Sequence, residues 1–282
     1  MPHDSARHSL PPIPDRLPIS LVDNHTHLDI VRDDGPTLAI EEALEAAAQV
    51  GVDRIVQIGC DLESARASVA MAHRHPGVVA GVALHPNEAP RLAESGGLGA
   101  AYTLIEELAH DPRVRVIGET GLDYFRTGEQ GRASQHESFR WHIDVAKRVG
   151  KPLQIHDRDS HDDILAVLDE VGAPQRVIMH CFSGDVSFAR ACLERGFYLS
   201  FAGPITFKNN HALRDALAVT PLDRVLLETD APYLTPHPWR GAVNSSYLLA
   251  TTARTAASVL GVAVAHLCEA VSVTCEELYG PW

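Results

Sequence analysis

The stretch PLQIHDRDSHDDILAVLDEVG, residues 152–172, contains a complete strand-to-helix unit. Its first five residues, PLQIH, form a short segment with Leu153 and Ile155 that resembles the strands of a buried parallel sheet. The segment 163–171 has the Leu, Val and Ile spacing of an amphipathic helix, and Gly172 directly after it is a common helix stop. The stretch therefore predicts a β-α unit of the α/β class.

Seven further short runs rich in Val, Ile or Leu predict strands at 19–24, 54–59, 78–84, 113–119, 176–180, 197–201 and 224–228. Helix-like segments separate many of them, and three of these segments end at a glycine: 38–50, 135–149 and 186–195. Such an alternation predicts a (β/α)8 TIM barrel of the α/β class. The stretch 244–278 has a helical composition and is expected to cover the outside of the barrel.

The chain shows no internal repeat and no linker between domains. We therefore expect a single domain over residues 20–282, preceded by a flexible, proline-rich tail over residues 1–19. This tail lacks the apolar core of a secretion signal, and no apolar run reaches the roughly 18 residues of a membrane span. The apolar fraction of 45% and the charged fraction of 22% are typical of a soluble enzyme.

The cysteine pattern and the net charge limit the compartment and the partners. There are five cysteines and no Cys-x-x-Cys, which favours a reducing, cytoplasmic location without disulfides. The formal net charge of −13 gives no long-range attraction for nucleic acid, so any phosphate contact must be local. We expect no membrane partner. The oligomeric state is left open, a monomer included.

Residues with metal-ligating side chains lie at or just after the ends of five of the predicted strands. Because catalytic groups of such barrels lie where the strands end, these side chains are expected to meet at one mouth. The set consists of His25, His27, Glu119, His156, His180 and Asp230.

Each residue of this set taken alone also fits a structural role, such as a cap or a turn, but their joint placement favours a metal site. His25 and His27 are two residues apart and face the same way on an extended chain, so both can hold one ion. Imidazole and carboxylate suit Zn, Mn and similar divalent ions, which acidify a bound water. Glu119 can bridge two ions about 3.5–4 Å apart, with His156 and His180 completing the second site. Asp230 can accept a proton from the water.

The motifs around these residues resemble the TatD family of metal-dependent hydrolases, in the amidohydrolase-like barrel superfamily. The matching stretches are DNHTHLD (23–29), IGETGLDYFR (117–126), PLQIHDRDS (152–160), MHCFSGD (179–185), SFAGPITFKN (200–209) and ETDAPYLTP (228–236). The resemblance implies one or two divalent ions (Mg, Mn or Zn), the six residues as their ligands, and hydrolysis of DNA phosphodiesters. It also implies Glu119 as the bridge and Asp230 as ligand and general base.

Two places depart from the family pattern. The usual Asn-Glu-Pro after the strand-8 loop is replaced by Asn244-Ser245-Ser246, and the usual Thr-x-Asn-Ala near the C-terminus by Thr274-Cys275-Glu276-Glu277. Neither change touches an expected ligand. The first change alters the loop where the substrate is expected, so it bears on substrate choice more than on chemistry.

Positive and aromatic side chains near the ligands are candidates for substrate binding. A nuclease needs cations there, because the transition state carries extra negative charge. The candidates are Arg158, Arg126, Lys208 and His85. Tyr124, Phe125 and Phe182 can stack on bases or simply pack. The substrate is thus expected to be DNA or another phosphate-bearing molecule. The alternative is an ester or amide such as an aminoacyl-tRNA ester, which the same chemistry would hydrolyse.

Overall fold

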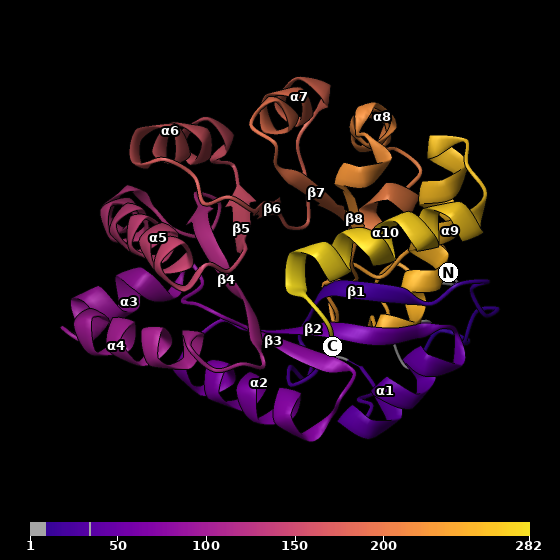
Figure 1. Ribbon diagram of the computed structural model, residues 1–282, viewed down its shortest axis with the longest axis horizontal. Coiled ribbons are helices and arrows are strands. Elements are labelled where there is room, and N and C mark those ends of the chain that lie inside the picture. The colour runs from indigo at the N-terminus through magenta and orange to yellow at the C-terminus, as the bar shows by residue number, and fades with distance from the viewer. Residues whose placement is uncertain (1–9, 34) are drawn as a thin grey trace. The chain divides into compact units, whose positions relative to one another are not determined.

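The computed structural model describes residues 10–33 and 35–282, and these residues divide into two compact units. Among the described residues, unit 1 consists of 10–33, 35–56, 184–190 and 199–277, and unit 2 consists of 57–183, 191–198 and 278–282. Strands β2 (Val52–Gly59) and β7 (Tyr198–Phe201) contribute residues to both units, as do helices α7 (Val186–Glu194) and α10 (Val264–Tyr279). Figure 1 labels these elements along the chain.

The remaining elements fall within one unit each. Unit 1 also contains β1 (Leu21–Thr26), α1 (Ile40–Gln49), η2 (Gly203–Thr206), α8 (His211–Val219), η3 (Leu222–Arg224), β8 (Val225–Leu227), η4 (Ser246–Leu248) and α9 (Leu249–Leu260). Unit 2 also contains α2 (Leu62–Arg74), β3 (Val78–Val82), α3 (Glu88–Glu94), α4 (Leu98–Ala109), β4 (Val114–Asp123), α5 (Glu129–Val149), β5 (Leu153–Arg158), α6 (His161–Val171) and β6 (Val177–Met179).

The strands form one eight-stranded sheet in the order β1-β2-β3-β4-β5-β6-β7-β8. The pairs β3–β4, β4–β5, β5–β6 and β7–β8 are parallel. Within unit 1, the segment after β8 returns to β1, since the amide of Asp230 donates to the carbonyl of His25 over 2.9 Å. Sequential strand order with intervening helices is the (β/α)8 TIM-barrel arrangement, so the predicted fold class is confirmed.

All eight predicted strands are present, with shifts of a few residues at their ends. The strand expected at 113–119 extends to Asp123, and the strand expected at 152–156 extends to Arg158. The helix expected at 135–149 begins six residues earlier, at Glu129, and ends before Gly150, whose φ of 66° suits glycine. The strands are buried because helices cover them, as expected for parallel sheets.

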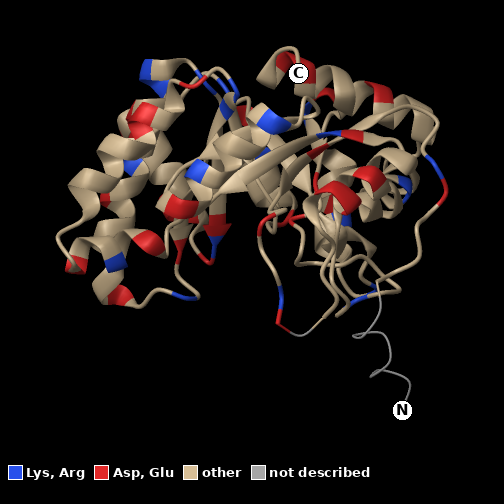
Figure 2. Ribbon diagram, turned by 90° about the horizontal axis from the view of Figure 1, so that it is seen from below, with Lys and Arg blue, Asp and Glu red and all other residues tan. Residues whose placement is uncertain are grey.

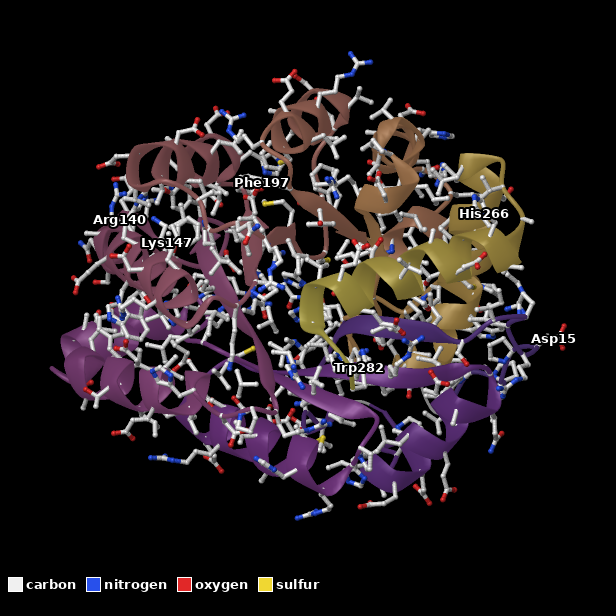
Figure 3. All side chains as sticks on the ribbon, viewed as in Figure 1. Asp15, Arg140, Lys147, Phe197, His266 and Trp282 are labelled. Atoms are coloured by element: carbon white, nitrogen blue, oxygen red, sulfur yellow. The ribbon has the colours of Figure 1, made fainter. Side chains whose placement is uncertain are left out.

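Helix α5 illustrates how one helix separates core from surface. Phe139 and Ile143 are fully buried on its inner side. Arg140 and Lys147, which Figure 3 labels on the same helix, bind groups of helix α6 instead. The Arg140 guanidinium pairs with Glu170 at 2.6 Å, and the Lys147 ammonium donates to the carbonyl of Val171.

The segment before β1 packs against unit 1 over its described part. Leu17 is 3% exposed and its amide donates to the carbonyl of Val50, while the Tyr247 hydroxyl donates to the carbonyl of Pro11. The flexible tail was expected over residues 1–19, and residues 1–9 of it lie outside the described residues. Residues 10–19 are held by such contacts. The single-domain assignment of residues 20–282 stays a prediction.

Acidic and basic residues are interspersed along the helices (Figure 2). Among residues 10–33 and 35–282, no single helix has the length and apolar character to cross a membrane, although the bent pair Ser246–Leu260 and Val264–Tyr279 meets these two criteria together.

Candidate metal centre

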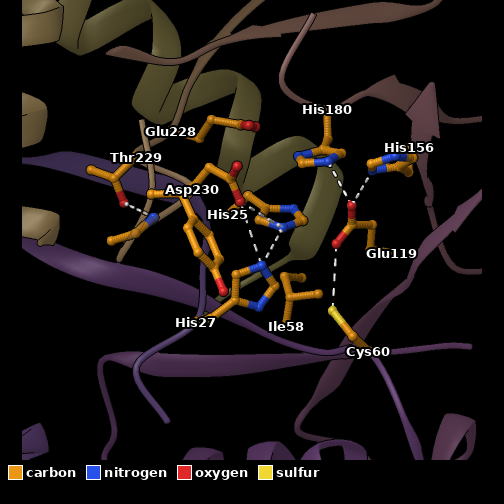
Figure 4. Close-up of polar contacts among 12 residues, drawn as sticks. His25, His27, Ile58, Cys60, Glu119, His156, His180, Glu228, Thr229 and Asp230 are labelled. Carbon is orange, nitrogen blue, oxygen red and sulfur yellow. Dashed lines mark hydrogen bonds and ion pairs between the residues drawn. The ribbon is translucent and has the colours of Figure 1, made fainter. Parts of the chain in front are cut away.

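Three predicted ligands come together in unit 1, and we call them the first trio: His25, His27 and Asp230. The Nε2 atoms of the two histidines lie 3.3 Å apart. Oδ1 of Asp230 lies 3.8 Å from Nε2 of His25 and 3.5 Å from Nε2 of His27. The potential ligand atoms all lie within 4.8 Å of one another, and Figure 4 shows them converging. Such a set of two imidazoles and one carboxylate suits a divalent ion.

The backbone around Asp230 brings its carboxylate to the two histidines. Asp230 has a φ of 52°, in the left-handed region that non-glycine residues rarely adopt. Two backbone hydrogen bonds hold this conformation: Asp230 N donates to His25 O, and His27 N donates to Ala231 O, over 2.9 and 2.8 Å. Unusual backbone conformations of this kind concentrate at functional sites, because surrounding structure must enforce them.

A buried carboxylate, Asp23, anchors the residue just before Asp230. Its Oδ1 accepts from the amide of Thr229 over 2.9 Å, and its Oδ2 accepts from the Thr229 hydroxyl over 2.6 Å. Asp23 is fully buried, and this burial raises its pKa to about 7 despite the hydrogen bonds from Thr229 and Ser246. The clamp joins the strand that carries the two histidines to the loop that carries Asp230.

Asn244 braces the same loop from the other side, at the place where the family pattern changes. Its side-chain amide donates to the carbonyl of Thr229 over 2.9 Å and to the carbonyl of Tyr233 over 2.6 Å. Ser245 and Ser246, which replace the usual Glu-Pro, are buried at the start of η4. Asn244 therefore holds the strand-8 loop although the two residues after it differ.

The other three predicted ligands come together in unit 2, and we call them the second trio: Glu119, His156 and His180. Oε1 of Glu119 lies 2.5 Å from Nδ1 of His156 and 2.9 Å from Nε2 of His180 (Figure 4). Glu119 is 4% exposed and His180 is 5% exposed. The strands β4, β5 and β6 deliver these residues, since each residue lies within or just after one of them.

The second trio is strongly coupled electrostatically. Burial opposes ionisation of Glu119, but three neighbouring imidazoles outweigh burial and hold the pKa of this carboxyl well below its ordinary value. These imidazoles belong to His180, His85 and His156. Burial likewise disfavours the charged form of His156, yet Glu119 and Asp123 outweigh it and raise the pKa of His156. Glu119 is therefore an ionised acceptor that faces several rings, as a metal-binding carboxylate must be.

Asp123 is the carboxylate that orients His156. Its Oδ2 lies 3.3 Å from Nε2 of His156, on the side of the ring opposite Glu119. Metal-binding histidines usually have such a partner for the ring nitrogen that does not face the ion. Position in the sequence alone does not distinguish Asp123 from Asp157 for this role. Asp157 instead bonds Ser160 and His161, over 2.8 and 2.6 Å.

Two further side chains of unit 2 contact Glu119. The Cys60 thiol donates to Oε2 of Glu119 over 3.4 Å (Figure 4). Cys60 directly follows β2, but an isolated cysteine after a strand carries no recognisable signal, and sequence reasoning missed it. His85 was expected to bind substrate. Its Nε2 lies 3.5 Å from Oε1 of Glu119, and its ring centroid lies 4.5 Å from that of His156.

The predicted substrate-binding cations lie in different surroundings. Arg158 ends β5, two residues after His156, and its guanidinium lies over the Phe125 ring. Arg126 is exposed, and its amide donates to Oδ1 of Asp123 over 2.8 Å. Lys208 is exposed in the loop between η2 and α8 of unit 1. Within the described parts of the chain, the Lys208 ammonium has no hydrogen bond or ion pair with the first trio.

Comparison with known proteins identifies the family of this chain. A family model described as "TatD related DNase" matches residues 22–280. The chain is 44% identical over 245 residues to an uncharacterized metal-dependent hydrolase, TatD, of Mycobacterium tuberculosis. This alignment covers 85% of this chain and 90% of that protein. It is 39% identical over 225 residues to the uncharacterized metal-dependent hydrolase YabD of Bacillus subtilis, with 79% and 85% covered.

Solved structures share the fold. The TatD homologue YjjV of Escherichia coli K12 superimposes with a TM-score of 0.82 at 24% identity, over 92% of this chain and 97% of that chain. A TatD family hydrolase of Entamoeba histolytica gives a TM-score of 0.81 at 18% identity, over 95% and 99%. The match of the family model to nearly the whole strand and helix region, together with relatives above 30% identity, shows that this chain belongs to the TatD family of metal-dependent hydrolases.

Proposed function

We propose that this metal-dependent hydrolase is a deoxyribonuclease that cleaves phosphodiester bonds of DNA by metal-assisted attack of water. The observation that carries the proposal is the pair of trios, each built from imidazoles and a carboxylate, in a chain that matches a family named for a DNase. His25, His27 and Asp230 would hold one divalent ion, and Glu119, His156 and His180 would hold another. The metal can be Mg, Mn or Zn, since all accept these donors.

The residues of the chain have distinct tasks in such a reaction. A bound divalent ion supplies Lewis-acid polarisation of a phosphoryl oxygen and lowers the pKa of water. Asp230 accepts the proton of the attacking water, because its carboxylate is part-exposed beside two buried imidazoles. Glu119 remains ionised and fixes the rings of His156 and His180. Its role as a bridge between two ions stays a prediction. Arg158 and Arg126 are proposed to contact the phosphates, as are Lys208 and His85.

The direct test is cleavage of end-labelled DNA by the purified chain with magnesium, manganese or zinc. We expect metal-dependent cleavage that falls at least about a hundredfold in Asp230→Asn and in His156→Ala. The product pattern will also distinguish removal of terminal nucleotides from internal cuts. If no metal supports cleavage, or if His156→Ala cuts as the wild type does, the proposal is wrong.

One observation favours a second candidate, the hydrolysis of an ester such as an aminoacyl-tRNA ester. The net charge of −13 provides no long-range attraction for a DNA polyanion. The same water and ions would serve an ester carbonyl. Turnover on a panel of aminoacyl esters and oligonucleotides, measured with the same metal and the same His156→Ala control, separates the two candidates.

A further inference from the structure

An exposed aromatic ring and a guanidinium form a layered pair in unit 2. Phe125 lies just after β4 and is 63% exposed. The guanidinium carbon of Arg158 lies 3.9 Å from the centroid of the Phe125 ring, in the geometry of a cation–π contact. Exposure of an apolar phenylalanine ring to water is unfavourable, and the planar Arg158 guanidinium covers one face of this ring. The pair therefore presents a flat, positively charged, apolar surface.

Sheet register ties this pair to the second trio. Strands β4 and β5 pair so that Gly121 is opposite His156 and Asp123 is opposite Arg158. Directly beyond this register, the amide of Tyr124 donates to the carbonyl of Arg158 over 2.9 Å. Arg158 of the layered pair therefore lies two residues after the predicted metal ligand His156, and backbone hydrogen bonds between β4 and β5 place it beside the Phe125 segment.

The turn that carries Phe125 is fixed to the same ligand. Oδ1 of Asp123 accepts from the amide of Arg126 over 2.8 Å, and Oδ2 of Asp123 faces His156 at 3.3 Å. Asn87 also donates to Oδ2, over 3.2 Å. One carboxylate therefore sets both the orientation of the His156 ring and the start of the turn that presents Phe125.

The charge of Arg158 is available to a ligand. Across residues 10–33 and 35–282, no carboxylate forms an ion pair with the Arg158 guanidinium. Its neighbour Asp157 instead forms hydrogen bonds with Ser160 and His161.

A second pair of guanidinium and aromatic ring involves the residue before Phe125: the guanidinium carbon of Arg132 is 3.9 Å from the centroid of the Tyr124 ring. The Tyr124 ring, however, is held in place by the hydrogen bonds of its hydroxyl with His136 and Asp163, so we assign it a structural role.

We propose that Phe125 and Arg158 form a stacking platform that holds a nucleobase next to the phosphodiester to be cleaved. This inference rests on the proposed deoxyribonuclease function. Every base has a π-face that stacks on aromatic rings and guanidinium planes, so such a platform binds bases without reading their sequence. A nucleotide on the platform has its phosphate within reach of the Arg158 charge, two residues from His156. A metal hydrolase of small esters needs no exposed platform of this kind.

The test measures DNA binding and cleavage separately in matched variants. Binding of an oligonucleotide that contains 2-aminopurine and cleavage-resistant phosphorothioate linkages is followed by its fluorescence with the metal-loaded chain. We expect Phe125→Ala to raise Kd and KM by about five- to a hundredfold, while kcat changes less. Phe125→Trp should restore binding, because it keeps an aromatic face, and Phe125→Leu should not. Val273→Ala, at a valine that is 50% exposed on α10, is the control for loss of an exposed apolar side chain.

Arg158→Lys separates stacking from charge. Lysine keeps the positive charge but lacks the planar guanidinium, so it should keep the salt dependence of binding and lose the change in 2-aminopurine fluorescence. The platform is wrong if the wild type cuts DNA and Phe125→Ala binds and cuts it equally well. An effect of Phe125→Ala on aminoacyl-ester turnover alone would also overturn it. Absence of cleavage by the wild type with every metal would instead refute the deoxyribonuclease function itself.

Discussion

Asp123 and His156 are joined across neighbouring strands by a 3.3 Å contact between Oδ2 and Nε2, while the other ring nitrogen faces Glu119. The imidazole is thereby held between the carboxylates of Glu119 and Asp123. We propose that Nδ1 of His156 faces the ion and that Asp123 supports the ring from Nε2, which leads to the first prediction.

Asp123→Asn should weaken metal binding by the second trio about ten- to a hundredfold, because the amide cannot support the imidazole as a carboxylate does. Metal affinity is measured by competition with a chromophoric chelator. Asp157→Asn is the matched control, since that neighbouring carboxylate bonds Ser160 and His161 instead. Equal losses of affinity in the two variants would contradict the assigned role of Asp123.

The two trios should bind their ions separately. We expect His27→Ala and His180→Ala each to reduce the content of divalent ions from about two to about one per chain after equilibrium dialysis, and a strong chelator to abolish turnover. Elemental analysis gives the content. His266→Ala, at an exposed histidine of α10 labelled in Figure 3, should retain the wild-type content. Full content in both trio variants would show that the ligands are assigned wrongly.

Thr229→Val should lower the free energy of unfolding by about 1–3 kcal/mol, because a buried carboxylate loses its hydroxyl donor. The distance from the Thr229 hydroxyl to Oδ2 of Asp23 is 2.6 Å, and Asp23 is fully buried. Urea unfolding measures the change. Thr103→Val on α4 removes an exposed hydroxyl that donates to the carbonyl of Gly99, and it should cost less than about 0.5 kcal/mol. If the two variants lower the free energy of unfolding by similar amounts, the Asp23–Thr229 hydrogen bond does not have the stabilising role assigned to it.

Stability should fall in mild acid because of His142. This fully buried imidazole accepts from the amide of Leu84 over 3.1 Å, and its other nitrogen bonds the carbonyl of Ser138 over 2.7 Å. Burial lowers the pKa of His142 from 6.5 to about 4. Since the folded state holds the proton less well than the unfolded state, the stabilisation is complete above pH 6.5 and is lost as pH falls towards 4.

The expected loss from His142 is about 2 kcal/mol between pH 7 and pH 5. Urea unfolding as a function of pH should show this slope in the wild type and a flatter profile in His142→Gln. His73→Gln, at a histidine whose side chain is 53% exposed, should keep the wild-type slope. An unchanged slope in His142→Gln would assign the acid sensitivity to other groups.

The fold and the grouping of the predicted ligands follow from the sequence because both depend on local signals, while their role as ligands stays a prediction. Apolar runs such as residues 152–156 mark strands by themselves, and a barrel places residues such as His156 and His180 at strand ends whatever the packing details. The contacts of Cys60 and Asp123 with these ligands depend on register between strands that are distant in sequence. Phe125 against Arg158 is the clearest case: the register that joins them appears only after β4 and β5 pair.

Strand ends were less accessible than strand identity. The sequence predicts that one strand ends at Glu119, but β4 continues to Asp123 because it pairs with β5. The residues 118–123, GETGLD, include polar side chains that do not indicate a strand. Tertiary pairing overrides local propensity there. The helix that begins at Glu129 was likewise expected to begin later, because its first turns contain Gly131 and few apolar residues.

The division of the chain between the two units sets an order in which the ligands become available during synthesis. Unit 2 is built almost wholly from the continuous stretch 57–183, so the second trio is complete once His180 has left the ribosome. The first trio must wait, because the clamp that places Asp230 joins Asp23 to Thr229 across 206 residues. His25 and His27 come long before Asp230 in the sequence, so they leave the ribosome well before their carboxylate partner does. One trio is thus built within a nearly continuous stretch of chain, and the other is built across a separation of about two hundred residues.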